Sequence, residues 1–164
     1  MCLITEHARA LKRLAEVEAE LAKYTLPPPP EINRYVEPAD TVRERLASLN
    51  IQLLYGLLDT NYVLTDFEGW GKVFEYIYMA VQPPEYLTDK FDCEDFAIWL
   101  KAMVSAYFKL NWFGMVIGEM PLGRHGFNLF FDREHYWLWE PQSVTDGEPF
   151  RLGDRGYNPL YILI

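Results

Sequence analysis

Four consecutive prolines, Pro27–Pro30, constrain this chain more than any other feature of its sequence. Proline fixes its own φ angle and has no N–H to donate, so a run of four ends any helix and holds a short, stiff polyproline II segment. The run is the clearest boundary in the chain. The 164 residues are therefore predicted to divide into an amphipathic helix at 1–26, a proline-rich linker at 27–39 and one folded domain at 40–164.

The segment before the prolines has the spacing of a coiled-coil seam. Mostly apolar residues recur at alternating intervals of four and three, and charged residues occupy the other faces. The seam positions are Leu3, His7, Ala10, Leu14, Val17, Leu21 and Tyr24. Two interpretations are open: residues 3–24 pair with a partner helix or with a second copy of the chain, or they form an amphipathic helix that folds back on its own domain.

The composition is that of a folded, acidic protein. Half of the residues are hydrophobic and 16% are aromatic, which is enough for a core, and the formal net charge is −9. That charge argues against nucleic acid and against anionic lipid as partners, because both require a basic face. No stretch is long and apolar enough to span a membrane, and the N-terminus lacks the features of a signal peptide. We therefore expect a cytosolic protein with two free thiols, Cys2 and Cys93.

The hydrophobic period changes part-way along the predicted domain. Helical spacing with suitable start and stop residues predicts helices from Asp40, over 69–81 and from Cys93 to about Lys109. Short β-rich runs follow and predict strands at 115–117, 127–131, 136–139 and 157–164. Helices first and strands afterwards indicate an α+β fold.

Cys93 lies at the start of the last of these helices. Asp92 is a suitable N-cap, and Asp95 can reach back to it as in a capping box. Free N–H groups and the helix dipole in the first turn stabilise a thiolate and can face an oxyanion, although the neighbouring carboxylates oppose the thiolate. An inert buried thiol is the alternative, since Cys93 also begins the apolar stripe of its helix.

A thiol nucleophile needs a base, and His125 is the best placed of the three histidines because it opens an apolar strand. If 127–131 and 136–139 pair as a hairpin, His125 and Glu140 lie at the same open end of it, within cross-strand reach. Cys93, His125 and Glu140 are therefore the predicted catalytic triad, in which Glu140 orients the imidazole. A solvated turn histidine is the alternative.

Three segments resemble the site segments of bacterial transglutaminase-like cysteine peptidases. They are Phe91-Asp92-Cys93-Glu94-Asp95-Phe96-Ala97 for the nucleophile, Gly123-Arg124-His125-Gly126-Phe127-Asn128 for the histidine strand and Trp139-Glu140-Pro141-Gln142 for the third strand. Their order matches the Cys, His, acid order of the family, and the resemblance covers about residues 69–142. The chain departs from the family at Glu140, where Asp or Asn is usual, at Phe91, where glycine is common, and at Arg124, where a glycine often precedes the histidine.

The resemblance implies a papain/transglutaminase-like core, in which the helix that bears the nucleophile packs on a small antiparallel sheet, with an N-terminal helical arm. It implies thiol-dependent acyl transfer or amide hydrolysis, by a peptidase, a deamidase or a transglutaminase-like enzyme, on a protein or peptide substrate and without a cofactor. Gln82 and Gln142 are the candidates to support the oxyanion or the triad. The candidates to line the substrate cleft are Trp70, Tyr86 and Trp139.

Two other classes of function are open from the sequence. The chain can be a non-catalytic protein-binding or assembly module that keeps the fold, which the helical arm and the proline spacer favour and which also suits a phage or mobile-element protein. The acidic residues around Cys93 can instead hold a metal ion, and their oxygen ligands favour calcium. Those residues are Asp89, Asp92, Glu94 and Asp95.

Overall fold

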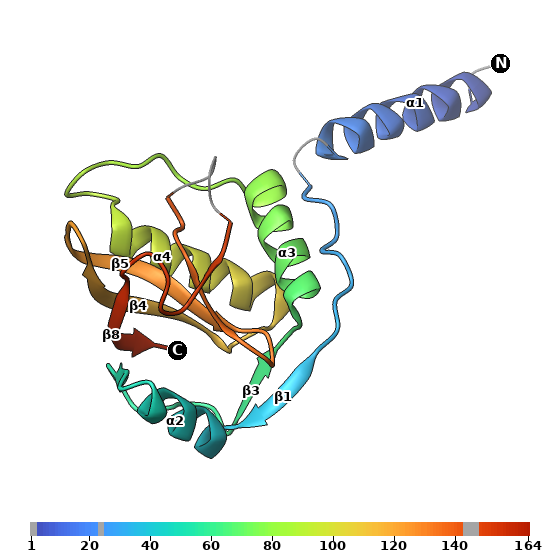
Figure 1. Ribbon diagram of the computed structural model, residues 1–164. Helices are drawn as coiled ribbons and strands as arrows, with labels where there is room; N and C mark the ends of the chain where they lie inside the picture. Colours follow the sequence, from blue (N-terminus) through green and yellow to red (C-terminus); the bar gives the residue numbers. More distant parts are fainter. Residues whose placement is uncertain (1–2, 23–24, 143–147) are drawn as a thin grey trace.

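The computed structural model describes residues 3–22, 25–142 and 148–164. An N-terminal helix, α1 (Leu3–Ala22), extends away from the rest of the molecule (Figure 1). The later helices are α2 (Ala39–Ser48), α3 (Phe67–Tyr76), which continues as the π-helix η1 (Ile77–Val81), and α4 (Cys93–Met103), which continues as the π-helix η2 (Val104–Phe108).

A six-stranded sheet forms the centre of the molecule, with the order β2-β8-β4-β5-β6-β7, and β1 and β3 form a separate antiparallel pair. The strands are β1 (Tyr35–Pro38), β2 (Gln52–Leu53), β3 (Asn61–Leu64), β4 (Phe113–Met120), β5 (Gly123–Phe131), β6 (Tyr136–Trp139), β7 (Phe150–Arg151) and β8 (Asn158–Leu163). Neighbours in the large sheet are antiparallel except β2 and β8, which are parallel. The two-residue strands β2 and β7 form its edges, and the long strands β4 and β5 lie between them.

The large sheet is covered on both faces, by α3 and α4 on one and by α2 on the other (Figure 1). Successive side chains of a strand point to opposite faces, so β5 contributes to two cores. Phe127, Leu129 and Phe131 pack in the core with α2, and Phe130 packs in the core with α3 and α4. The sequence at 127–131 is therefore almost continuously apolar instead of alternating.

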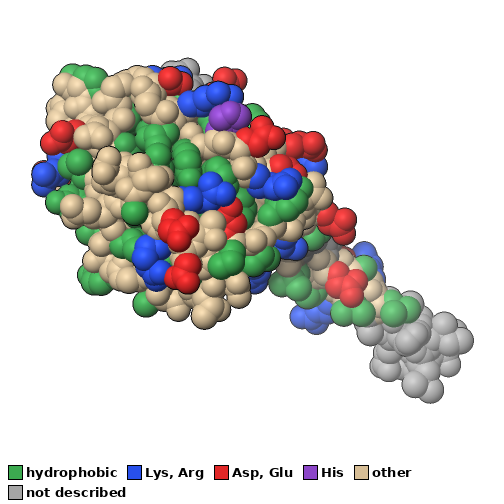
Figure 2. Space-filling model, turned by 60° about the horizontal axis from the view of Figure 1, so that its bottom comes forward, with side chains coloured by type: hydrophobic (Ala, Val, Ile, Leu, Met, Phe, Trp, Pro, Cys, Tyr) green, Lys and Arg blue, Asp and Glu red, His purple; other side chains and the backbone are tan. Residues whose placement is uncertain are grey.

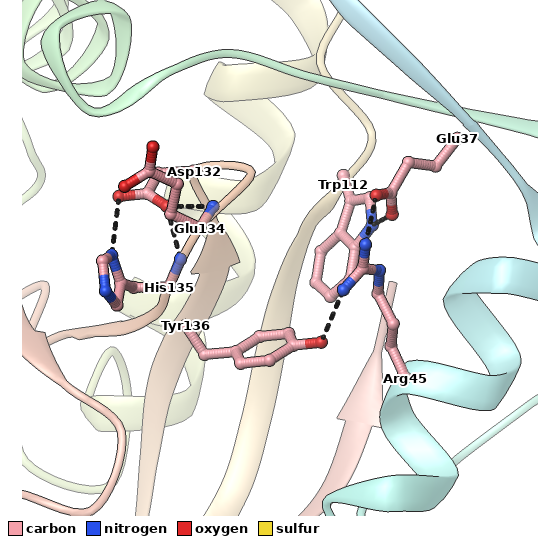
Figure 3. Close-up of polar contacts among 7 residues, drawn as sticks. All are labelled: Glu37, Arg45, Trp112, Asp132, Glu134, His135 and Tyr136. Atoms are coloured by element: carbon pink, nitrogen blue, oxygen red, sulfur yellow. Dashed lines mark hydrogen bonds and ion pairs between the residues drawn. The ribbon is translucent and has the colours of Figure 1, made fainter.

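A polar cluster joins β1 and α2 to the large sheet (Figure 3). Arg45 on α2 donates to one carboxylate oxygen of Glu37 at 2.9 Å and to the Tyr136 hydroxyl at 3.4 Å. Trp112 Nε1 donates to the other Glu37 oxygen at 3.0 Å. The Arg45 guanidinium also lies 4.3 Å from the centre of the Phe131 ring. The cluster therefore fixes α2 against the sheet through both hydrogen bonds and a cation–π contact.

The helices predicted from periodicity are confirmed, and α4 begins at Cys93. The predicted strands correspond to parts of β4, β5, β6 and β8. For the predicted helix at 3–24, residues 23–24 lie outside the described residues.

The predicted α+β arrangement, with helices first on a small antiparallel sheet, is wrong. β1 precedes α2, and β2 and β3 precede α3, so strands and helices are interleaved. The large sheet has six strands and includes a parallel pair. The three early strands are two to four residues long, which is too short for an alternating pattern to stand out in the sequence.

The apolar seam of α1 is exposed where the structure describes its side chains. Leu11, Leu14, Val17 and Leu21 are 53–62% exposed, so the helix does not fold back on the domain. Figure 2 shows apolar and charged side chains together on this helix as it leaves the body. In the described part of the chain, no helix combines the length and the apolar character that a membrane span requires.

Candidate functional site

Cys93 lies where the N-terminus of α4 meets β5. Asp95 accepts the backbone N–H of Asp92 at 3.4 Å, as part of a capping box that starts the helix at Cys93. Gly126 on β5 lets this end of the helix come close to the sheet, because a Cβ at that position would lie only 2.7 Å from Glu94 Cα. Cys93 and Glu94 are therefore held against the strand that carries the neighbouring His125.

The Cys93 thiol donates a hydrogen bond to the Glu94 carboxylate at 3.0 Å. Burial, and then this hydrogen bond, raise the pKa of the thiol above its ordinary value, and the backbone N–H of Gly126 offsets the effect only in part. The same hydrogen bond lowers the pKa of Glu94. These effects on the pKa favour the protonated thiol, which is the donor in this hydrogen bond.

His125 and Glu140 contact each other across β5 and the end of β6. His125 Nε2 lies 3.0 and 2.9 Å from the two carboxylate oxygens, and the side chains are only 16% and 19% exposed. The Tyr157 hydroxyl donates to the same carboxylate at 2.9 Å. Burial and the Glu140 charge raise the pKa of Tyr157 to about 12, so it remains a donor. Sequence reasoning missed Tyr157, because its contact with Glu140 depends on where the last strand enters the sheet.

The structure brings His125 and Glu140 together and places Cys93 on the adjacent helix end. Within the described part of the chain, no hydrogen bond joins Cys93 Sγ to the His125 ring, and the sulfur is bonded to Glu94 instead. The site therefore consists of a His125–Glu140 pair and a separate hydrogen bond between the thiol and Glu94.

The other residues predicted around the cysteine are dispersed. Gln82 is exposed directly after η1, with a left-handed φ of 61°. Gln142 Nε2 is buried and has no hydrogen-bond partner within the described residues. Tyr86 is 47% exposed and stacks on Phe96, with ring centroids 6.0 Å apart. The two glutamines therefore lie outside the hydrogen bonds that surround Cys93.

Three ligand atoms near the start of α4 are close enough to share a metal ion. Asp92, Cys93 and Glu94 each offer one atom, and these atoms lie within 4.8 Å of one another. The backbone N–H of Asp89 donates to Asp92, and Asp95 belongs to the helix cap. Two carboxylates and a sulfur suit a softer ion than calcium, which takes six to eight oxygens. Metal binding here stays a prediction.

A pocket of about 580 Å³, which we call the aromatic pocket, lies among α3, η1 and Trp139. Its rings are Phe67, Trp70, Phe74, Tyr78 and Trp139, and its carboxylates are Glu75 and Glu148. Trp70 and Trp139, expected to line a cleft near Cys93, thus line a separate cavity. The π-helix η1 supplies Tyr78 and Met79, and such irregular helical turns often occur at functional sites.

The polar atoms of these aromatic residues are bonded within the protein. Trp70 Nε1 donates to the Phe131 carbonyl at 3.0 Å, and Trp139 Nε1 donates to the Tyr78 hydroxyl at 3.1 Å. That hydroxyl donates to the Pro141 carbonyl at 2.8 Å, and burial raises the pKa of Tyr78 to about 12. The aromatic pocket therefore offers a ligand the exposed ring of Phe67 in front of largely buried rings, together with carboxylate oxygens. Among its described lining residues there is no free aromatic N–H or O–H.

Neither a family model nor a curated protein matches this chain. Solved structures do. The chain shares its fold with part of Polyporus squamosus lectin. One match, described as "PSL1a-E64 complex", has a TM-score of 0.61 and 21% identity, over 79% of this chain and 51% of that chain. Another, Polyporus squamosus lectin bound to the human-type influenza-binding epitope Neu5Aca2-6Galb1-4GlcNAc, has a TM-score of 0.62 and 19% identity, over 79% of this chain and 49% of that chain. The chain thus spans about half the length of the structures that it matches.

The assignment to bacterial transglutaminase-like cysteine peptidases, with its papain/transglutaminase-like core, is therefore wrong. The matching structures are those of a lectin. The acids that suggested the family have local roles, since Asp92 and Asp95 cap α4 and Glu94 binds the thiol. The expected thiol-dependent acyl transfer or amide hydrolysis is corrected for the same reason, because the solved structures that share the fold are those of a lectin. The expected peptide or protein substrate is corrected likewise, because the matched lectin is described with a glycan.

Proposed function

We propose that this chain is a non-catalytic carbohydrate-binding module and that the aromatic pocket holds the sugar. The lining of the pocket carries the proposal: five aromatic rings surround a cavity of about 580 Å³ that has two carboxylates. Sugars present C–H faces that pack on aromatic rings and hydroxyl groups that donate to carboxylates. A mostly apolar cavity with a few polar groups is the usual form of a small-ligand site. The likeness in fold to a lectin bound to a glycan epitope supports the same conclusion.

Replacing Phe67 with alanine is expected to weaken oligosaccharide binding by about tenfold or more, as for a central aromatic contact. Phe67 is 47% exposed at the pocket, so its loss removes a ring face without opening the core. Titration calorimetry measures the affinity. Quenching of tryptophan fluorescence reports the same event, because Trp70 and Trp139 line the pocket.

Tyr86→Ala is the matched control, since Tyr86 is also an aromatic residue with 47% exposure but lies outside the pocket. Its affinity is expected to equal that of the unaltered chain. Equal weakening by the two substitutions, or the absence of any heat or quenching with a panel of neutral oligosaccharides, would contradict carbohydrate binding at this pocket.

We propose, second, that Cys93, His125 and Glu140 belong to one polar site. The observation that favours it is the contact of Gly126 with Glu94, which puts the helix end that bears the thiol beside the His125–Glu140 pair. The structure supports a hydrogen-bonding site at this place, with Cys93 as a donor.

In a Cys2→Ser background, Cys93 is expected to react with iodoacetamide more slowly than a free thiol at neutral pH, because its pKa is raised. Glu94→Gln is expected to accelerate the reaction, since removing the carboxylate lowers the pKa of the thiol. Glu75→Gln, in the aromatic pocket, is the control and leaves the rate unchanged. Labelling faster than a free thiol at pH 6, abolished by His125→Ala, would show instead that His125 holds a thiolate.

We also propose that the chain consists of a helix at 1–26, a linker at 27–39 and a domain at 40–164. The aromatic pocket and the Cys93 site both lie in the third of these parts. A cytosolic location and a phage or mobile-element origin are kept as predictions.

A further inference from the structure

We infer that the aromatic pocket prefers a sugar with a free ammonium group, of the glucosamine type, over N-acetylated and sialylated sugars. This inference rests on the proposed carbohydrate binding and names the class of sugar. It follows from the charges and from the hydrogen-bonding groups that the pocket leaves available.

The ionised side chains that line the pocket are carboxylates. Glu75 on α3 and Glu148 before β7 are both exposed to solvent, and neither forms an ion pair within the described part of the chain. Lys72, the basic residue nearest to Glu75 in sequence, is paired with Glu68 at 2.8 Å. Among the described lining residues there is no Lys, Arg or His to balance the two carboxylates.

The hydrogen-bonding groups of the pocket also favour a ligand with an ammonium group. The Trp70, Trp139 and Tyr78 donors are used within the protein, so the pocket offers acceptors to a ligand. An ammonium group brings three donors and a positive charge, which a carboxylate accepts and which the face of an aromatic ring also attracts.

Competing sugars lack this match. An N-acetyl group has one donor and no charge. The carboxylate of a sialic acid would face Glu75 and Glu148 in a protein whose net charge is −9, and like charges repel.

The test compares glucosamine oligomers with N-acetylglucosamine oligomers of equal length and with the sialylated epitope, by titration calorimetry at pH 6. The glucosamine oligomer is expected to bind about tenfold more tightly than its N-acetylated counterpart, and the sialylated sugar most weakly.

Because the carboxylates are exposed, the preference for the glucosamine oligomer is expected to decrease as the salt concentration is raised. The double variant Glu75→Gln, Glu148→Gln is expected to reduce the preference to within about twofold, whereas Glu85→Gln, outside the pocket, leaves the preference unchanged.

The outcomes separate this inference from the function on which it rests. Equal or tighter binding of the N-acetylated oligomer, with Phe67→Ala weakening both sugars, overturns the preference and leaves carbohydrate binding in place. Binding of the glucosamine oligomer that Phe67→Ala does not weaken is adsorption to an acidic surface and overturns the preference as a property of the pocket. Binding of none of the sugars overturns the proposed function itself.

Discussion

Replacing Trp70 with alanine is expected to lower the free energy of unfolding by about 3–5 kcal/mol. The side chain is fully buried, and its ring lies 5.7, 5.4 and 4.9 Å from those of Phe74, Phe113 and Phe130. The substitution leaves a cavity between α3 and the sheet, and it deprives the Phe131 carbonyl of the indole donor. Urea denaturation followed by far-ultraviolet circular dichroism measures the loss independently of tryptophan fluorescence.

Two variants bracket this result. Trp70→Phe keeps most of the ring and loses the N–H, so a smaller loss of about 1–3 kcal/mol is expected. Leu122→Ala, at a side chain that is 91% exposed, is expected to change stability by less than about 0.5 kcal/mol. A loss for Trp70→Ala no larger than that of Leu122→Ala would mean that the ring is not packed in the core.

Gly126→Ala is expected to have the second largest effect, a loss of about 1–3 kcal/mol. The added Cβ would lie 2.7 Å from Glu94 Cα and 2.8 Å from Glu94 N, and these are backbone atoms that cannot rotate away. The first turn of α4 must therefore move from β5. The thiol of Cys93 then becomes less buried, so its labelling by iodoacetamide is expected to accelerate together with the loss of stability.

Gly71→Ala is a control that is expected to raise the free energy of unfolding instead of lowering it. A Cβ at Gly71 meets no atom within 4 Å, and the residue lies inside α3, where alanine favours the helix by about 0.5–1 kcal/mol. Stabilisation by Gly71→Ala beside destabilisation by Gly126→Ala is the expected pair of results. Two equal effects would contradict the close approach of α4 to β5.

Long elements could be predicted from the sequence because each carries its own periodicity. The helix over 69–81 is an example: its apolar residues repeat at helical spacing, and Pro83 limits it. The parallel pairing of β2 with β8 could not be predicted, because it joins two residues to a strand more than 100 positions away. Local pattern contains no information about such a contact.

In the candidate site, too, the contact within one hairpin could be predicted, whereas contacts that depend on side-chain rotamers or on the tertiary fold could not. The proximity of His125 and Glu140 follows from one hairpin, whose strands are adjacent in sequence. The pairing of the Cys93 thiol with Glu94 depends on side-chain rotamers, and the Tyr157 contact depends on the position of β8. The aromatic pocket was missed as a unit, because its rings come from α3, η1 and β6 and are joined only by packing.

The two-residue edge strands have a consequence for aggregation. A sheet recruits strands from other molecules through unpaired N–H and C=O groups at its edges, and long flat edges do so most readily. Here β2 and β7 offer few such groups, while β4 is paired with β5 along its length and with β8 over 115–119, and β5 is paired with β6 at 128–131. Unfolding, which frees the backbone groups of β4 and β5, is therefore expected to favour strand pairing between molecules. Loss of protein to aggregation during expression or storage is then expected to increase as the free energy of unfolding falls. A destabilised variant such as Trp70→Ala is expected to precipitate more readily than the unaltered protein.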